Sequence, residues 1–202
     1  MTTTTPISAE AVKQLRELTG AGFMDCKHAL EETAGDVDRA TLLLREKGLS
    51  AAANKAGREA REGLVSSYIH TGGRIGVLIE VNCETDFVAR TDEFQKLVRS
   101  LAMQVAGLAP EFVTIDSIPA DVLAAKRQEL LSDPMVQGKS EAIRAQIVDG
   151  QLRKWQQQVV LYEQPYRDTD QTVGELVTAA VARIGEHIRV RRFNRYELGE
   201  EL

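Results

Sequence analysis

The sequence predicts an α+β protein, because three kinds of pattern follow one another along its 202 residues. Short segments with helical spacing fill the first fifty residues, and two apolar runs of strand character follow at residues 64–69 and 75–81. Helical patterns then return, and a last alternating stretch begins at Ile188. Helices, a hairpin, more helices and a strand in this order predict a small antiparallel sheet packed with helices.

The first fifty residues are expected to form a bundle of three short helices. Ser8 and Asp36 stand at N-cap positions, where a side-chain oxygen can accept hydrogen bonds from the first turn. Gly20, Gly35 and Gly48 each follow a helical pattern and are expected to end the helices. The apolar stripes are Val12, Leu15 and Leu18 in the first helix, Ala29 and Leu30 in the second at residues 25–33, and Val37, Ala40, Leu43 and Leu44 in the third.

Composition places a domain boundary after this bundle. Residues 50–63 are rich in Ala, Lys, Arg and Glu and poor in large apolar side chains, which is typical of a linker or a solvated helix. The predicted organisation is a bundle at residues 1–49, a linker at residues 50–62 and an α+β core at residues 63–202.

The core begins with the hairpin and continues into a buried helix. Thr71-Gly72-Gly73-Arg74 separates the two strand-like runs and reads as a hairpin turn. Thr91 can cap the next helix. The expected buried face of this helix consists of Phe94, Leu97, Val98, Leu101 and Val105.

The second half of the core is expected to contain a helical hairpin, a helix and a strand. Residues 119–131 and 140–155 have helical patterns, and Pro134 and Gly138 lie between them, which predicts an antiparallel helical hairpin at about residues 119–157. Thr172 and Glu175 have capping-box spacing before an apolar helical stripe. From Ile188 onward, residues of two kinds alternate, with Ile188, Val190 and Arg192 on one face and Arg189, Arg191 and Phe193 on the other, which predicts a last, half-exposed strand.

Bulk composition narrows the possible functions. The net charge of -5 argues against nucleic acid as a direct partner, since phosphate binding needs a basic surface. No apolar stretch approaches the roughly 18 residues of a membrane helix, and the chain starts without the charged and apolar leader of a signal peptide. Cys26 and Cys83 lie far apart and are expected to be free, buried thiols, so a cytoplasmic protein is expected.

The sequence supports neither a nucleotide-binding site nor a metal or thiol site. Gly138-Lys139-Ser140 resembles the end of a phosphate-binding loop, but Asp133 stands where such a loop requires glycine, and a loop between helices is favoured. Two cysteines and three histidines, with Cys26 and His28 close together, match no zinc pattern. The sequence therefore predicts neither a metal site nor a cofactor.

A cluster of arginines marks the last strand, at Arg189, Arg191, Arg192 and Arg195. We favour a solvated strand whose arginines cover an edge of the sheet, since charged side chains commonly protect such edges. Contact with RNA or phosphate is the alternative.

Two short apolar segments are candidates for binding a partner. Phe23 and Met24 either close the core of the bundle or form an exposed patch. Their pattern favours the core for one of the two but does not tell which. Thr85-Asp86-Phe87-Val88 stands at a corner between strand and helix, where a rigid frame can present side chains to a partner. The alternative is that Phe87 packs on the helix that starts at Thr91, while Asp86 caps a turn.

Two longer stretches resemble a known family. Residues 15–27, with the sequence L-R-E-L-T-G-A-G-F-M-D-C-K, resemble the N-terminal signature of bacterial elongation factor Ts. Residues 80–90, with the sequence E-V-N-C-E-T-D-F-V-A-R, resemble its second signature. The resemblance continues through the C-terminal part of the chain.

The resemblance implies a guanine nucleotide exchange factor that binds elongation factor Tu and promotes GDP release, with no bond-making chemistry of its own. Asp86 and Phe87, within the segment Thr85 to Val88, would be a wedge near the magnesium and nucleotide site of that GTPase. The N-terminal bundle would dock on the G domain through Val12, Arg16, Phe23 and Met24.

The resemblance also implies a dimer. Long family members carry two related sheet subdomains, with the wedge on the first and a hairpin histidine that contacts the GTPase on the second. This chain has one hairpin, so Asp86, Phe87 and His70 lie on a single copy. A homodimer, in which one protomer supplies the wedge and the other supplies His70, is therefore expected.

Two rival functions make different predictions. The bundle resembles ubiquitin-associated domains in its three short helices, so the chain could be an adaptor that recruits a protease or chaperone without changing GDP release. An enzyme would require His70, Cys83 and Asp86 to converge in a cleft.

Overall fold

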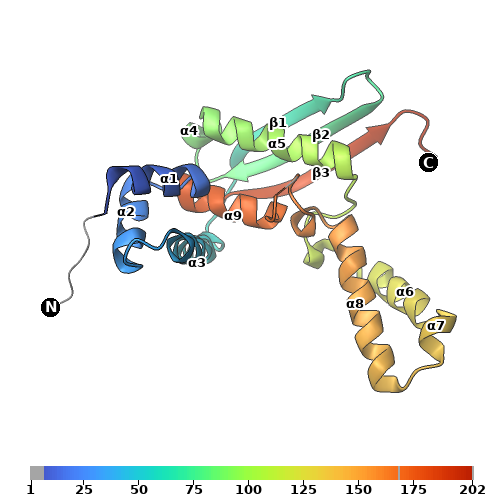
Figure 1. Cartoon of the computed structure of the whole chain (residues 1–202). Coiled ribbons are helices and arrows are strands. Elements are labelled where there is room, and N and C mark those ends of the chain that lie inside the picture. Colours follow the sequence, from blue (N-terminus) through green and yellow to red (C-terminus); the bar gives the residue numbers. More distant parts are fainter. Residues whose placement is uncertain (1–6, 168, 202) are drawn as a thin grey trace. The chain divides into compact units, whose positions relative to one another are not determined.

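The computed structural model describes residues 7–167 and 169–201 and confirms the α+β class. Contacts divide the chain into two compact units. The first unit comprises Met1–Gly63, Asn82–Thr91 and Leu176–Arg189, and the second comprises Leu64–Val81, Asp92–Glu175 and Val190–Leu202. The elements (Figure 1) are α1 (Ala9–Thr19), α2 (Phe23–Glu32), α3 (Val37–Lys55), β1 (Glu62–Ile69), β2 (Ile75–Cys83), α4 (Asp86–Ala89), α5 (Asp92–Leu108), η1 (Ile115–Ser117), α6 (Ala120–Leu131), α7 (Pro134–Gln137), α8 (Glu141–Val159), η2 (Leu161–Glu163), α9 (Val173–Ile184) and β3 (Arg189–Glu197).

In the first unit, α1, α2 and α3 pack around a small core. The predicted caps are confirmed: Ser8 accepts a hydrogen bond from the amide of Ala11 (3.1 Å), and Asp36 accepts one from the amide of Arg39 (3.0 Å). Gly20 ends α1 with φ 69°, a backbone conformation that favours glycine. The buried cluster consists of Val12, Leu15, Cys26, Ala29, Leu30 and Ala40.

Three details of the bundle differ from the sequence prediction. Leu18 is 64% exposed rather than buried, because α1 turns only Val12 and Leu15 toward the core. The second helix begins at Phe23, two residues before the expected start. The third helix continues through Gly48 to Lys55, since a single glycine costs a helix only about 1 kcal/mol and an alanine-rich run follows it.

The strands β1, β2 and β3 of the described residues form one antiparallel sheet in that order. The predicted hairpin is confirmed: the amide of Gly73 donates to the carbonyl of His70 (2.9 Å), and the amide of His70 donates to the carbonyl of Ile75 (2.9 Å). Gly72 and Gly73 both have positive φ, which explains two glycines in this turn.

The predicted buried face of α5 is also confirmed, with Phe94, Leu97, Val98, Leu101 and Val105 all buried. A hydrogen bond joins this helix to the sheet, because the guanidinium of Arg195 in β3 donates to the carbonyl of Ala106 (3.4 Å).

The helices α6 and α8 form the predicted helical hairpin, with α7 in the connection between them (Figure 1). Asp133 caps α7 by accepting a hydrogen bond from the amide of Met135 (2.8 Å), and Pro134 occupies the first turn. Arg127 pairs with Asp149 across the hairpin (3.1 Å). None of the described helices is long and apolar enough to cross a membrane.

The start of α9 has the capping box that its sequence predicts. The amide of Thr172 donates to the Glu175 carboxylate (2.8 Å), and the amide of Glu175 donates to the Thr172 hydroxyl (3.2 Å). Gly185 follows the helix with φ 86° and directs the chain toward β3.

Candidate partner-binding site

The segment Thr85–Ala89 forms a single helical turn directly after β2. Thr85 is its N-cap, because the Thr85 hydroxyl accepts a hydrogen bond from the amide of Val88 (3.3 Å). The alternative in which Asp86 caps a turn at this corner is therefore wrong. Asp86 is the first residue of α4, and its carboxylate pairs with Arg90 one turn later (2.8 Å).

The turn presents one large apolar side chain to solvent. Phe87 is 78% exposed, whereas Val88 and Ala89 of the same turn are buried. The alternative in which Phe87 packs on the following helix is therefore wrong. Val88, which the resemblance places in the binding segment, anchors the turn from inside the protein.

A carboxylate about a hundred residues away in the chain holds this turn. Oε2 of Glu186 accepts hydrogen bonds from the amides of Glu84 (3.0 Å) and Thr85 (3.1 Å), and Oε1 accepts one from the Thr85 hydroxyl (2.7 Å). All three residues belong to the first unit. Glu186 could not be predicted from the sequence, because a pair so distant in the chain leaves no local pattern. Its only signal is a carboxylate directly after Gly185.

Cys83 lies beneath the turn and is not placed for nucleophilic chemistry. It is fully buried, and its thiol donates to the carbonyl of Thr85 (3.1 Å). Burial, followed by the negative charge of Glu186, raises the pKa of the Cys83 thiol from 9.0 to about 11. A thiol held neutral at physiological pH is a poor nucleophile, which argues against the enzyme alternative.

Cys26 is likewise a buried, free thiol, as the sequence predicts, and burial is the main cause that raises its pKa. Within residues 7–167 and 169–201, no group of three or more His, Cys, Asp or Glu side chains is placed to hold a metal ion. Gly138 follows α7 and precedes α8, so the sequence that resembles a phosphate-binding loop is a connection between helices.

The bundle presents a second exposed apolar patch at the start of α2. Phe23 is 49% exposed and Met24 is 55% exposed, so the structure places both outside the core. Arg16 on α1 is exposed as well. Val12 is 2% exposed and belongs to the core, so it supports this surface from inside instead of presenting its own side chain.

His70 lies in the second unit, at the hairpin turn between β1 and β2. Its ring is exposed, and Nδ1 lies 3.1 Å from the hydroxyl of Tyr68.

Three arginines of the cluster are engaged with carboxylates of the same chain. Glu80 accepts hydrogen bonds from Arg191 (2.9 Å) and Arg192 (2.7 Å), and Arg195 pairs with Glu197 (2.7 Å). β3 is an edge strand of the described sheet, which agrees with the interpretation that these arginines cover an edge of the sheet.

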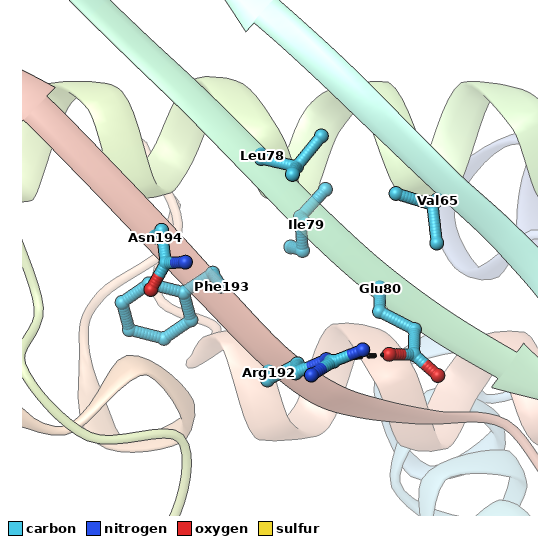
Figure 2. A pocket seen from close by; sticks show the side chains of 7 residues that line it. All are labelled: Val65, Leu78, Ile79, Glu80, Arg192, Phe193 and Asn194. Carbon is cyan, nitrogen blue, oxygen red and sulfur yellow. Dashed lines mark hydrogen bonds and ion pairs between the residues drawn. The ribbon is translucent and has the colours of Figure 1, made fainter.

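A groove of about 210 Å³ lies on this sheet. Figure 2 shows that Arg192 and Glu80, which both line it, are joined. Val65, Leu78 and Phe193 also line it.

Comparisons with known proteins show the family to which this chain is similar. The family model described as elongation factor TS matches residues 52–200. Elongation factor Ts of Carboxydothermus hydrogenoformans is 52% identical over 97% of this chain and 91% of its own length. Those of Thermoanaerobacter sp. (strain X514) and Moorella thermoacetica are 52% and 53% identical, each over 96% of this chain and 96% of its own length.

These matches define the class of the protein as a translation elongation factor. The chain belongs to the elongation factor Ts family.

Proposed function

We propose that the chain is the guanine nucleotide exchange factor of the GTPase elongation factor Tu. It binds the GDP-bound GTPase, promotes GDP release and thereby allows GTP to bind in the bacterial cytoplasm. The observation that carries this proposal is the Phe87 side chain, which is 78% exposed, whereas Val88 and Ala89, the next two residues of the same turn, are buried. Membership of the elongation factor Ts family supports the same function.

In this mechanism the turn acts as a wedge near the magnesium and nucleotide site. Phe87 inserts apolar volume between helices of the GTPase, and Asp86 disturbs the interactions around the magnesium ion. Contacts that the exchange factor makes only with the nucleotide-free GTPase weaken the binding of GDP to the GTPase. By linkage, bound GDP weakens the complex of the two proteins by the same factor. The exchange factor itself makes or breaks no bond and needs no cofactor.

The bundle serves as the docking domain in this proposal. Arg16, Phe23 and Met24 form an exposed surface that fits contact with the G domain, and Val12 supports it from the core. The three short helices are of the ubiquitin-associated type. Residues 1–49 would then dock, residues 50–62 connect, and residues 63–202 form the core and dimerisation domain.

We further propose that the active form is a homodimer in which His70 of one protomer and the wedge of the other contact the same GTPase. Val65 and Ile69 of β1 are each 64% exposed, and Leu78 of β2 is 47% exposed. Pairing of sheets between protomers would remove such apolar area from water. Sedimentation equilibrium combined with the exchange assay tests this idea, and a fully active monomer would refute it.

Stopped-flow release of fluorescent GDP from elongation factor Tu tests the exchange function. We expect the release rate to rise with the concentration of this protein and most of the acceleration to be lost with Phe87→Ala. Folded wild-type protein that binds the GTPase but leaves the release rate unchanged would contradict the proposal. That result would favour the adaptor alternative.

A further inference from the structure

The corner between β2 and α4 is tied to the end of α9 by reciprocal hydrogen bonds. In one direction, the Glu186 carboxylate accepts from the amides of Glu84 and Thr85 and from the Thr85 hydroxyl. In the other direction, Oε1 of Glu84 accepts from the amide of His187 (2.6 Å). Each of the two segments therefore supplies both a carboxylate and backbone donors to the other.

The segment after α3 joins the same network. Nη1 of Arg58 lies 3.6 Å from Oε1 of Glu84, and Nδ1 of His187 lies 2.7 Å from the carbonyl oxygen of Arg58. Three stretches that are far apart in sequence thus meet behind the exposed turn, within a single compact unit.

The turn needs this support because it is too short to hold its own shape. A helix of four residues, Asp86–Ala89, forms too few internal hydrogen bonds to offset the entropy of ordering its backbone. Its cap is the Thr85 hydroxyl, and the same hydroxyl donates to Glu186. The carboxylate therefore fixes the rotamer in which Thr85 can cap the turn that carries Asp86 and Phe87.

The end of α9 also meets the loop that leads into the docking surface. If Gly20 carried a side chain, its Cβ would lie 2.9 Å from Nη1 of Arg183, so the Arg183 guanidinium packs directly on the end of α1. Residues 183–187 consequently contact the loop before Phe23 at one end and the corner before Phe87 at the other. Such a segment holds the two exposed surfaces in a fixed relation.

We propose that Glu186 is a positioning residue for nucleotide exchange, which holds the Thr85 cap so that Asp86 and Phe87 meet the GTPase in one orientation. This inference rests on the exchange function proposed above. Glu186 itself need not touch the GTPase. Its loss should therefore lower the maximal rate of GDP release more than it lowers the affinity of the complex.

The test is stopped-flow release of fluorescent GDP from elongation factor Tu, measured over a range of concentrations of the wild type, Glu186→Ala and Glu186→Gln. The titration separates the maximal rate from the concentration that gives half of it. For Glu186→Ala we expect the maximal rate to fall about tenfold, as the loss of charge-assisted hydrogen bonds suggests, with the half-saturating concentration within about threefold.

Glu186→Gln should restore most of the maximal rate, to within about threefold of the wild type. The amide oxygen can still accept from the two backbone amides, and the amide nitrogen can donate to the Thr85 hydroxyl oxygen, which retains a second lone pair for Val88. Asp149→Ala is the matched control, because it removes a half-exposed carboxylate outside the proposed docking bundle that pairs with Arg127 (3.1 Å). It should leave both parameters unchanged.

The results separate the two proposals. If the wild type does not accelerate release, or if Phe87→Ala equals the wild type, the exchange mechanism itself fails. If the wild type and Phe87→Ala behave as expected but folded Glu186→Ala keeps the wild-type maximal rate, the positioning role of Glu186 is refuted. This holds even if the melting temperature of Glu186→Ala falls. Should Glu186→Ala not fold, Glu186→Asp keeps the charge and shortens the reach by one methylene, and the same fall in maximal rate is expected. An unchanged maximal rate in folded Glu186→Asp would refute the role in that case.

Discussion

Replacing Phe87 with alanine should slow catalysed GDP release by about 30-fold. Burying a phenylalanine side chain fully is worth about 1.5–3 kcal/mol. Phe87 is 78% exposed in the free chain, so most of that free energy, about 2 kcal/mol, remains available for contact with the GTPase. If the contact forms only in the complex that releases GDP, a loss of about 2 kcal/mol lowers the rate about 30-fold.

The same substitution should hardly affect the stability of the free protein. Exposed side chains away from caps and cores change the free energy of unfolding by less than about 0.5 kcal/mol, which for a chain of this size corresponds to less than about 2 °C in melting temperature. Thermal unfolding of both proteins, followed by circular dichroism, measures this shift.

The assay pairs stopped-flow GDP release with a matched control. Met135→Ala removes another exposed apolar side chain, which is 81% exposed at the helical hairpin, and should leave the release rate unchanged. A fall in melting temperature of about 10 °C for Phe87→Ala would indicate the loss of about 3–5 kcal/mol that core phenylalanines show, and the wedge reasoning would be refuted. An unchanged release rate would refute it equally.

Three further substitutions test other parts of the structure. Phe23→Ala should raise the half-saturating concentration in the exchange titration several-fold and leave the maximal rate within about twofold, since Phe23 is 49% exposed on the docking surface; unchanged binding would remove it from that surface. Thr172→Ala should lower the free energy of unfolding by about 1 kcal/mol in urea titrations, because it breaks the hydrogen bond to the Glu175 amide, and a loss below about 0.3 kcal/mol would contradict the capping role. Because burial raises the pKa of Cys83 to about 11, its contribution to stability is complete below pH 9.0 and is lost as the pH rises toward 11. The free energy of unfolding should therefore fall more steeply over that range in the wild type than in Cys83→Ala, and parallel curves would contradict the raised pKa.

Local patterns predicted most of the elements, because their causes lie within a few residues. The capping box of Thr172 and Glu175, the cap at Ser8 and the hairpin glycines Gly72 and Gly73 each satisfy backbone groups of their own turn. Hence α9, α1 and the hairpin begin or turn where the sequence indicates. Gly48 shows the limit of this reasoning, because the surrounding helix outweighs the modest cost of one glycine.

Exposure could not be predicted in the same way. Leu18 fits the apolar stripe of α1, yet it is 64% exposed. For Phe23 and Met24, the sequence pattern left open which side chain lies in the core and which on the surface, and both are exposed. The direction in which a side chain points depends on which faces of the helices meet, and this is settled only when the bundle packs.

The sequence by itself determined the α+β class, the order of the elements, the two signature stretches and the corner that carries Asp86 and Phe87. Each of these depends on periodicity, capping or motif spacing, all of which are written along the chain. Only the tertiary structure decided that Phe87 is exposed while Val88 is buried, and that Glu186 holds the Thr85 cap. The physical reason is that burial and hydrogen bonding between residues about a hundred positions apart arise from the packing of separate segments, and no local pattern encodes which segments will meet.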